Sequence, residues 1–291
     1  MPQPVPHLVI TPAHNEEVHL SGLIVAMVRQ TVPPAEWIIV DDASTDRTAA
    51  LVDAAAAEHP WIRRLVPPHA TRRAVGGKVA RLFLHGFSRA NHGEWCFVSK
   101  IDADLSLPDD YFEQVFGRFA QDQRLGIAGG SCWERRGERL VLERVSTEHT
   151  RGALKSYRRE CWEAIGGIRP VDGWDGIDNV MAQMHGWRTR SFEEIRAIHR
   201  RPTGAFRGVL RGRYTAGRFA AFMGYLPLFM LGRVLRRTLD RPLLIGGLAM
   251  GWGYLHHRLQ RAARFDEPRV IAFLRQRQRE RIGLARRRAR G

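Results

Sequence analysis

Lysine is scarce in this chain, because only Lys78, Lys100 and Lys155 occur among its 46 basic residues and the rest are arginine. Cysteine is scarce too: its three residues include no pair at metal-ligand spacing, which excludes a disulfide framework and favours a reducing compartment. The first residues show no cationic start followed by a long apolar stretch, so we expect no export signal. Together these absences predict a cytoplasmic protein, or one held on the inner face of the cell membrane.

Long hydrophobic runs are also missing. The two most apolar blocks, 219–231 and 243–255, are thirteen residues long, whereas a helix needs about 20 to cross a bilayer. We therefore expect no transmembrane helix. Arginines separate the blocks, and Trp252 and Tyr254 lie in the second, which fits helices in the lipid headgroup region. A buried helical pair that packs on the main domain explains the same pattern equally well.

Positive charge dominates the carboxyl-terminal end. The formal net charge is +16, and from Arg258 to Arg290 twelve arginines face three acids. Such a segment suits anionic lipid, nucleic acid or a polyanionic acceptor, and charge alone does not choose among them. A solvated arginine-rich helix is the simpler alternative. Aromatic residues are sparse there, with only Phe265 and Phe273, which disfavours stacking on bases.

Short β-branched runs alternate with helical patterns in the first half of the chain. This alternation predicts an α/β fold, a Rossmann-like, mostly parallel sheet flanked by helices, followed by a helical appendage. With 291 residues, 44% of them hydrophobic, the chain can fill such a core. A glycine-containing stretch, 166–178, is expected to be a loop that builds part of a site. The predicted strands are 7–11, 37–40, 61–66, 95–101 and 125–133, and the predicted helices are 16–30, 78–90, 179–185 and two that begin at 45 and 108.

Acidic side chains follow the predicted strands. Asp102 and Asp104 come directly after one strand, and Asp41 and Asp42 end another. Because the carboxyl ends of parallel strands share one edge of a sheet, these side chains should converge beside the change in strand order, where ligands bind. Clustered carboxylates need a cation or hydrogen bonds to offset their repulsion, and hard oxygen ligands suit Mg²⁺ or Mn²⁺. The alternative for Asp102 and Asp104 alone is a solvated strand end.

Four segments, in this order and spacing, resemble the family 2 glycosyltransferases, which are inverting enzymes of the GT-A fold. The resemblance covers about residues 7 to 200. It implies a catalytic GT-A domain that binds a nucleotide sugar at 1–205, with a helical, basic region at 206–291. The segments are VITPAHNE at 9–16, VDDASTD at 40–46, Gly77-Lys78, and Asp102-Ala103-Asp104 followed by Pro108.

The resemblance assigns four residues to the nucleotide. Thr11 and Asp42 would contact its base, with Asp41 as a supporting acid. An aspartate that accepts a hydrogen bond from N3–H of uracil favours uridine, or another lactam-bearing base, over adenine, so a UDP-sugar is the expected donor. Lys78 would lie near the nucleotide, although a surface cation at the start of a helix is an equally simple role for it.

The same resemblance implies the reaction centre. Asp102 would face the ribose and Asp104 the metal that bridges the two phosphates. Separately, His199 follows the last apparent element of the sheet, and from that place it could complete the metal shell, meet a phosphate or be only structural. Inverting transfer also needs a base that takes the proton of the acceptor hydroxyl. The family has it in an acidic motif before a helix that ends in glycine, and here the common Glu-Asp form is absent. Counting back from that glycine favours Asp175, with Asp178 as the substitute base or a helix N-cap.

These features predict a metal-dependent inverting glycosyltransferase that adds a single sugar to a glycan or lipid-linked acceptor of the cell envelope, next to an anionic membrane surface. The processive signature Gln-x-x-Arg-Trp has no match in 207–214, which favours single addition. Two other functions fit part of the sequence. The basic end alone would fit a nucleic-acid-binding protein, although we expect no nucleic acid partner. A sugar nucleotidyltransferase has similar topology, but His14-Asn15-Glu16 stands where it needs a glycine-rich phosphate loop.

Overall fold

The structure is a computed structural model that describes residues 5–68, 77–91, 93–143, 146–201, 208–239 and 243–283. The chain divides into two units, Met1–Pro202 and Thr203–Gly291. The predicted boundary at 205–206, Arg207 in the segment without the processive signature, and the last arginines of the basic end lie outside the described residues.

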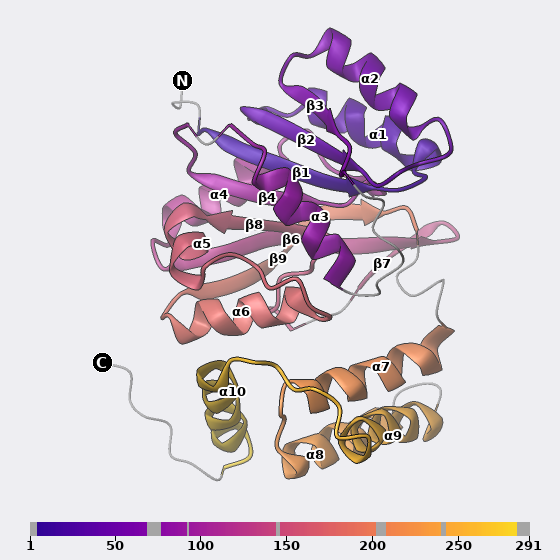
Figure 1. Ribbon diagram of the computed structural model, residues 1–291, viewed down its shortest axis with the longest axis vertical. Helices are drawn as coiled ribbons and strands as arrows, with labels where there is room; N and C mark the ends of the chain where they lie inside the picture. Colours follow the sequence, from indigo (N-terminus) through magenta and orange to yellow (C-terminus); the bar gives the residue numbers. More distant parts are fainter. Residues whose placement is uncertain are drawn as a thin grey trace. The chain divides into compact units, whose positions relative to one another are not determined.

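One mixed sheet organises the first unit, and within the described residues it has nine strands (Figure 1). Their order is β3-β2-β1-β4-β8-β6-β9-β5, with β7 paired to β6. The first four are mutually parallel, β8 runs antiparallel to both of its neighbours, and β6 and β9 are parallel. The strands are β1 (His7–Ala13), β2 (Glu36–Asp41), β3 (Ile62–Leu65), β4 (Phe97–Ile101), β5 (Leu105–Ser106), β6 (Leu125–Arg136), β7 (Arg139–Leu142), β8 (Leu154–Arg158) and β9 (Arg188–His199).

Helices cover the sheet, which explains why its central strands are apolar on both faces. On one side Val9 of β1 belongs to the main core, together with residues of α1 and α4. On the other side α3 crosses β1 and β2 at Gly86, where a Cβ would lie 2.7 Å from Ile10 and 2.8 Å from Val40. Only glycine lets the helix approach this closely. The helices are α1 (Glu17–Val28), α2 (Thr48–Glu58), α3 (Gly77–Phe87), α4 (Tyr111–Gln121), α5 (Arg159–Ile165) and α6 (Trp174–Met184).

Three predicted helix starts were wrong, and two of them lie next to the expected site. α4 begins at Tyr111, three residues after the predicted 108. α2 begins at Thr48, not 45, because the preceding loop hydrogen-bonds to the loop after β1 instead of continuing the helix. α6 begins at Trp174, five residues before the predicted 179, after Gly173 takes a left-handed conformation with φ of 74°. Asp178 therefore lies inside the helix and is not its N-cap. The remaining predicted strands and helices of this unit are present, with small shifts at their ends.

The second unit is helical in its described part. Its helices are α7 (Gly208–Phe222), α8 (Pro227–Thr238), α9 (Ile245–Leu259) and α10 (Pro268–Arg281). Of the two apolar blocks, the first ends in α8 and the second forms most of α9. Within the residues that are described, no helix combines the length and the apolar character that a membrane span needs.

Candidate active site

The loops after β1 and β2 are joined by hydrogen bonds at the carboxyl edge of the sheet. The two strands end in register, with Ala13 opposite Asp41. The Asn15 amide donates to Ser44 Oγ at 3.0 Å, and Asn15 Oδ1 accepts from the Thr45 amide at 2.7 Å. The polar motifs that the sequence placed after these strands therefore form one connected rim.

A histidine and two aspartates converge beside this rim. Asp102 and Asp104 follow β4, while His199 ends β9, and the pairing of Leu105 with His199 brings the histidine next to Asp104. His199 Nε2 lies 3.3 Å from Asp104 Oδ1. One potential ligand atom from each of Asp102, Asp104 and His199 lies within 4.8 Å of the others. The structure thus brings together the two predicted metal ligands and the predicted ribose contact.

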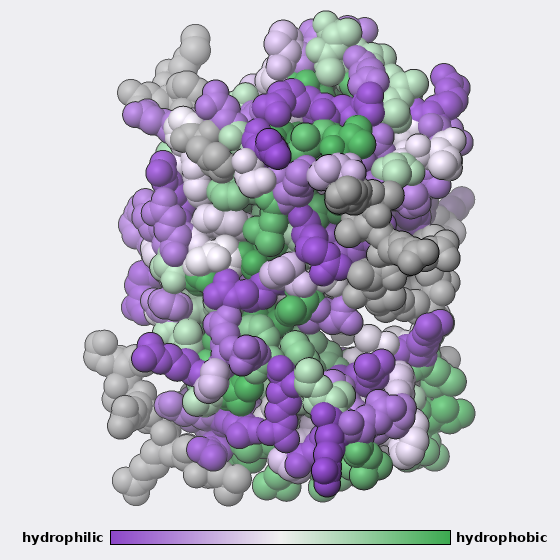
Figure 2. Space-filling model, viewed as in Figure 1, coloured by the Kyte–Doolittle hydropathy of each residue, from purple (hydrophilic) through white to green (hydrophobic). Residues whose placement is uncertain are grey.

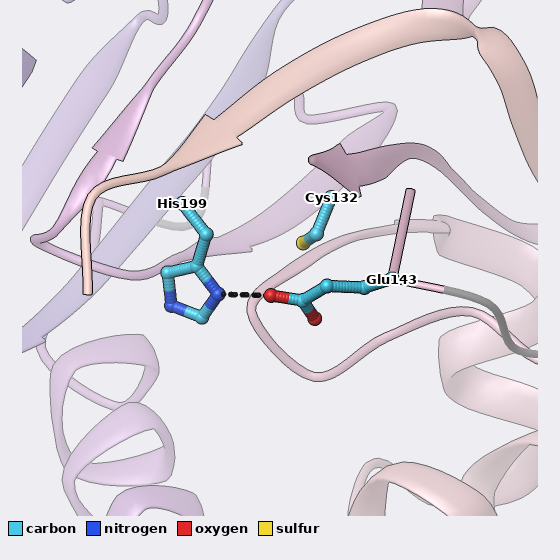
Figure 3. Close-up of side chains that lie close together, drawn as sticks. All are labelled: Cys132, Glu143 and His199. Atoms are coloured by element: carbon cyan, nitrogen blue, oxygen red, sulfur yellow. Dashed lines mark hydrogen bonds and ion pairs between the residues drawn. The ribbon is translucent and has the colours of Figure 1, made fainter. Parts of the chain in front are cut away.

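Glu143 lies against the other side of the His199 ring, and no sequence pattern indicated it. His199 Nδ1 lies 3.0 Å from Glu143 Oε1, as Figure 3 shows. The second oxygen, Glu143 Oε2, pairs with Arg151 Nη2 at 2.5 Å. Burial opposes the charged imidazole, but its contacts with Asp104 and Glu143 raise the pKa of His199 to about 9. Burial likewise opposes ionisation of Asp104, yet the hydrogen bond from His199 lowers the pKa of that carboxyl below its usual value.

A second possible ligand group shares the same histidine. Cys132, Glu143 and His199 also offer atoms within 4.8 Å of one another (Figure 3). However, the sulfur of Cys132 is a soft ligand, whereas Mg²⁺ and Mn²⁺ prefer oxygen and nitrogen ligands. Glu143 is already engaged by Arg151. The group of Asp102, Asp104 and His199 is the better fit to a hard divalent cation, because it offers carboxylate oxygens and imidazole nitrogen.

An arginine from the end of β9 links this cluster to the loop after β1. Arg201 forms a two-pronged pair with Glu16, through Nη1 to Oε1 at 3.1 Å and Nη2 to Oε2 at 2.8 Å. Its Nε lies 4.0 Å from Asp104 Oδ2. Burial raises the pKa of Glu16 although Arg201 opposes the shift. Positive charge is therefore held directly beside the carboxylates.

The residues predicted to hold the nucleotide differ in how accessible they are. Thr11 is completely buried and its hydroxyl accepts from the Trp37 indole at 2.9 Å, so its side chain has no surface to offer a base. Asp41 is buried, and its Oδ1 caps the Ser44 amide at 3.0 Å. The Asp42 carboxylate is also buried and forms an ion pair with Lys78. Lys78 thus lies at the rim, paired with Asp42.

The two candidate bases lie in very different surroundings on α6. Asp175 is in the first turn with its side chain 38% exposed, and Asp175 Oδ2 lies 4.0 Å from His149 Nε2. Asp178 is completely buried, and its carboxylate accepts from Lys155 Nζ at 2.8 and 2.9 Å and from the Tyr157 hydroxyl at 2.5 Å. Burial raises the pKa of Asp178, opposed by Lys155. Asp178 is therefore sealed inside the protein, whereas Asp175 can meet a ligand.

All three lysines of the chain lie in this region. Lys100 pairs with Asp102, and Lys155 also donates to the backbone oxygen of Asp175 at 2.7 Å. The Trp174 ring lies near both cations, 5.7 Å from Lys100 Nζ and 5.4 Å from Lys155 Nζ. Burial raises the pKa of the Asp102 carboxyl, and Lys100 opposes this shift. Trp174 and the lysines thus connect the aspartates after β4 to the start of α6.

Comparison with solved structures identifies the fold. The mannosyltransferase PcManGT from Pyrobaculum calidifontis, solved with GDP-Man and Mn²⁺, superposes with a TM-score of 0.55 at 19% identity, over 96% of this chain and 81% of that one. TarS residues 1–349 from S. aureus, solved with UDP-GlcNAc, give a TM-score of 0.53 at 14% identity over 88% and 73%. These matches concern the fold alone. They confirm the predicted α/β architecture of the GT-A type.

Sequence comparison gives information on the family as well as the fold. A polyprenol monophosphomannose synthase from Mycolicibacterium smegmatis is 29% identical over 174 residues, which are 54% of this chain and 63% of that protein. The chain therefore spans less than two thirds of this relative. The profile of glycosyl transferase family 2 matches residues 8–173, the part that contains β1 to β8 and most of the polar rim. Since this match extends over more than half of the chain, the protein belongs to glycosyl transferase family 2.

Proposed function

We propose that the first unit transfers one sugar from a nucleoside diphosphate sugar to a lipid-linked or glycan acceptor of the cell envelope, with inversion and with Mn²⁺ or Mg²⁺. The observation that carries this proposal is the convergence of Asp102, Asp104 and His199, whose ligand atoms lie within 4.8 Å. The known proteins agree with it: PcManGT was solved with GDP-Man and Mn²⁺, and the mycobacterial relative is named a polyprenol monophosphomannose synthase.

The residues for the metal are Asp104 and His199, with Asp102 beside them. Glu143 accepts at Nδ1 of His199, so Nε2 would be the ligand atom once a cation displaces its proton, as in the carboxylate–histidine pairs of known metal sites. A divalent cation held there would offset the negative charge that grows on the leaving diphosphate. Arg201, beside Asp104, adds fixed positive charge to the same place.

For the donor we propose Asp42 as the acceptor for a lactam N–H of the base, once Lys78 releases it and turns toward the phosphates. This would favour UDP- or GDP-sugars over ADP-sugars, and uridine remains the expected base. Asp41 supports the loop by capping Ser44 and need not touch the ligand. The burial of Thr11 argues for a structural role under the nucleotide site.

For the base we propose Asp175. Its exposed carboxylate can accept the proton of the acceptor hydroxyl, while Lys155 and Asn179 hold its backbone oxygen at 2.7 and 2.6 Å. Asp178 supports the start of the helix by neutralising the buried Lys155. An acceptor on a polyprenyl chain would be presented at a membrane, which would place the enzyme at the cytoplasmic membrane face.

Sugar transfer and Mn²⁺ binding together test this proposal. The purified protein is given UDP-, GDP- and ADP-sugars with a polyprenyl phosphate acceptor, and nucleoside diphosphate release and the anomeric configuration of the product are followed. Asp104→Asn should lower turnover by about 1,000-fold and weaken Mn²⁺ binding in paramagnetic resonance titrations. Asp53→Asn, at an exposed ion pair with Arg64, is the matched control and should change neither. Mn²⁺ binding unaffected in Asp104→Asn, or a product of retained configuration, contradicts the proposal.

A further inference from the structure

Large apolar side chains point outward along α8 and α9. We call this set the outer apolar face, and each member is more than half exposed. On α8 the spacing of three and four residues places them on one side of the helix, and the same holds on α9. Figure 2 shows apolar residues gathered at the end of the helical unit that carries α8 and α9. The outer apolar face consists of Leu228, Leu231, Leu235, Leu239, Leu243, Leu244, Ile245, Leu248, Trp252, Leu255 and Leu259.

The helices of the same unit approach one another at small residues. Its core cluster combines Ala220 and Ala221 with Met230, Met250 and Tyr254. α7 and α9 touch through glycine, because a Cβ on Gly217 would lie 1.9 Å from the Met250 carbonyl oxygen. Soluble domains bury leucine and expose smaller or polar residues. Here the glycines occupy the helix contact and the leucines remain outside, which is the distribution of a protein whose outer face meets a non-aqueous phase.

The charge of the second unit and the lengths of α8 and α9 indicate which non-aqueous phase the outer apolar face would meet. Residues 203–291 contain 20 arginines and four acidic residues, so this unit has a strong attraction for anionic surfaces. Arg236 on α8 and Arg258 on α9 are exposed next to the outer apolar face. At 12 and 15 residues the two helices are about 18 and 22 Å long, too short for a hydrocarbon core of about 30 Å. They can lie along a membrane surface but not cross it.

We propose that the outer apolar face docks on an anionic lipid bilayer, with α8 and α9 parallel to its plane, leucines among the acyl chains and arginines at the phosphates. Trp252, 56% exposed and stacked on His256, lies where an interfacial tryptophan is expected. The inference stands on the second unit alone and does not depend on the proposed sugar transfer.

Vesicle flotation of the full chain tests it. The protein should float with phosphatidylcholine vesicles that contain phosphatidylglycerol and bind pure phosphatidylcholine, or either vesicle at high salt, at least about tenfold more weakly. Leu231→Gln/Leu248→Gln/Leu255→Gln should lower binding by at least about tenfold. The matched control, Val18→Gln/Val25→Gln/Leu140→Gln, changes exposed apolar residues of the first unit and should bind like the parent.

A second measurement distinguishes a loss of vesicle binding from a loss of folding. Vesicles should shift the tryptophan emission to shorter wavelength, and the shift should be lost in Trp252→Phe, whose helical content and thermal unfolding should match the parent. The proposal is overturned if the triple glutamine variant floats as well as the parent. It is also overturned if sedimentation shows that the outer apolar face instead joins two copies of the chain, with the triple variant a monomer that binds vesicles normally.

Discussion

The two units of this protein differ in net charge and in which apolar side chains they bury. Residues 1–202 contain 26 basic and 26 acidic residues, so the whole formal charge of +16 belongs to residues 203–291. The first unit buries its large apolar side chains, such as Trp37 and Phe112, and among its described residues the large apolar side chains that stay exposed are valines and Leu140. The second unit buries alanine, glycine, methionine and tyrosine at its helix contacts and leaves most of its described leucines exposed.

Hydrophobic residues therefore have different roles in the two units. In the first unit, apolar burial stabilises a scaffold that holds buried charges in pairs, such as Lys155 with Asp178. In the second, many leucines stay exposed, and the proposed lipid surface would cover them. The units should therefore respond independently to substitutions, and four experiments test that expectation.

The largest effect is expected from Asp175→Asn, which removes the proposed base but leaves its surroundings. Sugar transfer should fall by about 100- to 10,000-fold, while donor binding and vesicle binding stay unchanged. Asp178→Asn is the informative comparison, because it leaves Lys155 buried without its counter-charge and should lower the thermal stability as well. Full activity in Asp175→Asn, with a folded but inactive Asp178→Asn, would reverse the assignment.

The next effect concerns the second unit alone. Gly217→Val should destabilise it by about 3 kcal/mol, because the new side chain overlaps the Met250 carbonyl and forces α7 away from α9. Gly212→Ala on the same helix meets nothing within 4 Å and should be neutral or slightly stabilising. Urea unfolding followed by limited proteolysis measures both. Loss of donor binding in Gly217→Val would show that the units are not independent.

A smaller effect, specific to the first unit, follows from the fully buried His7. Burial lowers the pKa of His7 from 6.5 to about 4, so between these values the unfolded chain binds a proton that the folded protein excludes. Stability is therefore lost as the pH falls from 6.5 toward 4, by up to about 3 kcal/mol. Urea unfolding at several pH values should show a shallower acid-side loss in His7→Leu than in the parent. Identical pH profiles would contradict this role.

The smallest expected change tests the support of the metal site. Glu143→Gln should weaken Mn²⁺ binding by about 10- to 100-fold, because a neutral amide orients His199 less firmly and makes it a poorer ligand. Glu194→Gln, an exposed carboxylate on β9, is the control. Paramagnetic resonance titration measures both without reference to turnover. Equal Mn²⁺ affinity in the two variants would remove Glu143 from the site.

The sequence predicted those parts of the fold that depend on local pattern. The apolar runs of β1, β2 and β4 and the acids after them are contiguous in the chain, and a parallel sheet then aligns their ends, so the rim could be anticipated from Asp42 and Asp104. The starts of the helices were harder to predict from the sequence. The true start of α6 depends on the left-handed Gly173, and a glycine among other glycines looks like part of a loop.

Contacts between residues that lie far apart in the chain could not be predicted from the sequence. β8 was not predicted, since Lys155 gives the strand a polar appearance, and only the distant Asp178 makes its burial tolerable. Glu143 lies 56 residues from His199, at the end of a hairpin that aims it at the ring. The burial of Thr11 also depends on a neighbour, the Trp37 indole across the β1–β2 pair.

The placement of the lysines has a practical consequence for chemical labelling. Lys100 and Lys155 are almost completely shielded from solvent, whereas the Lys78 side chain is 22% exposed. An amine-reactive ester should therefore attach at Lys78 and at the terminal amino group, in a protein whose other cations are arginines that such reagents ignore. A fluorophore placed there would stand beside Asp42, and its emission could follow donor occupancy in real time.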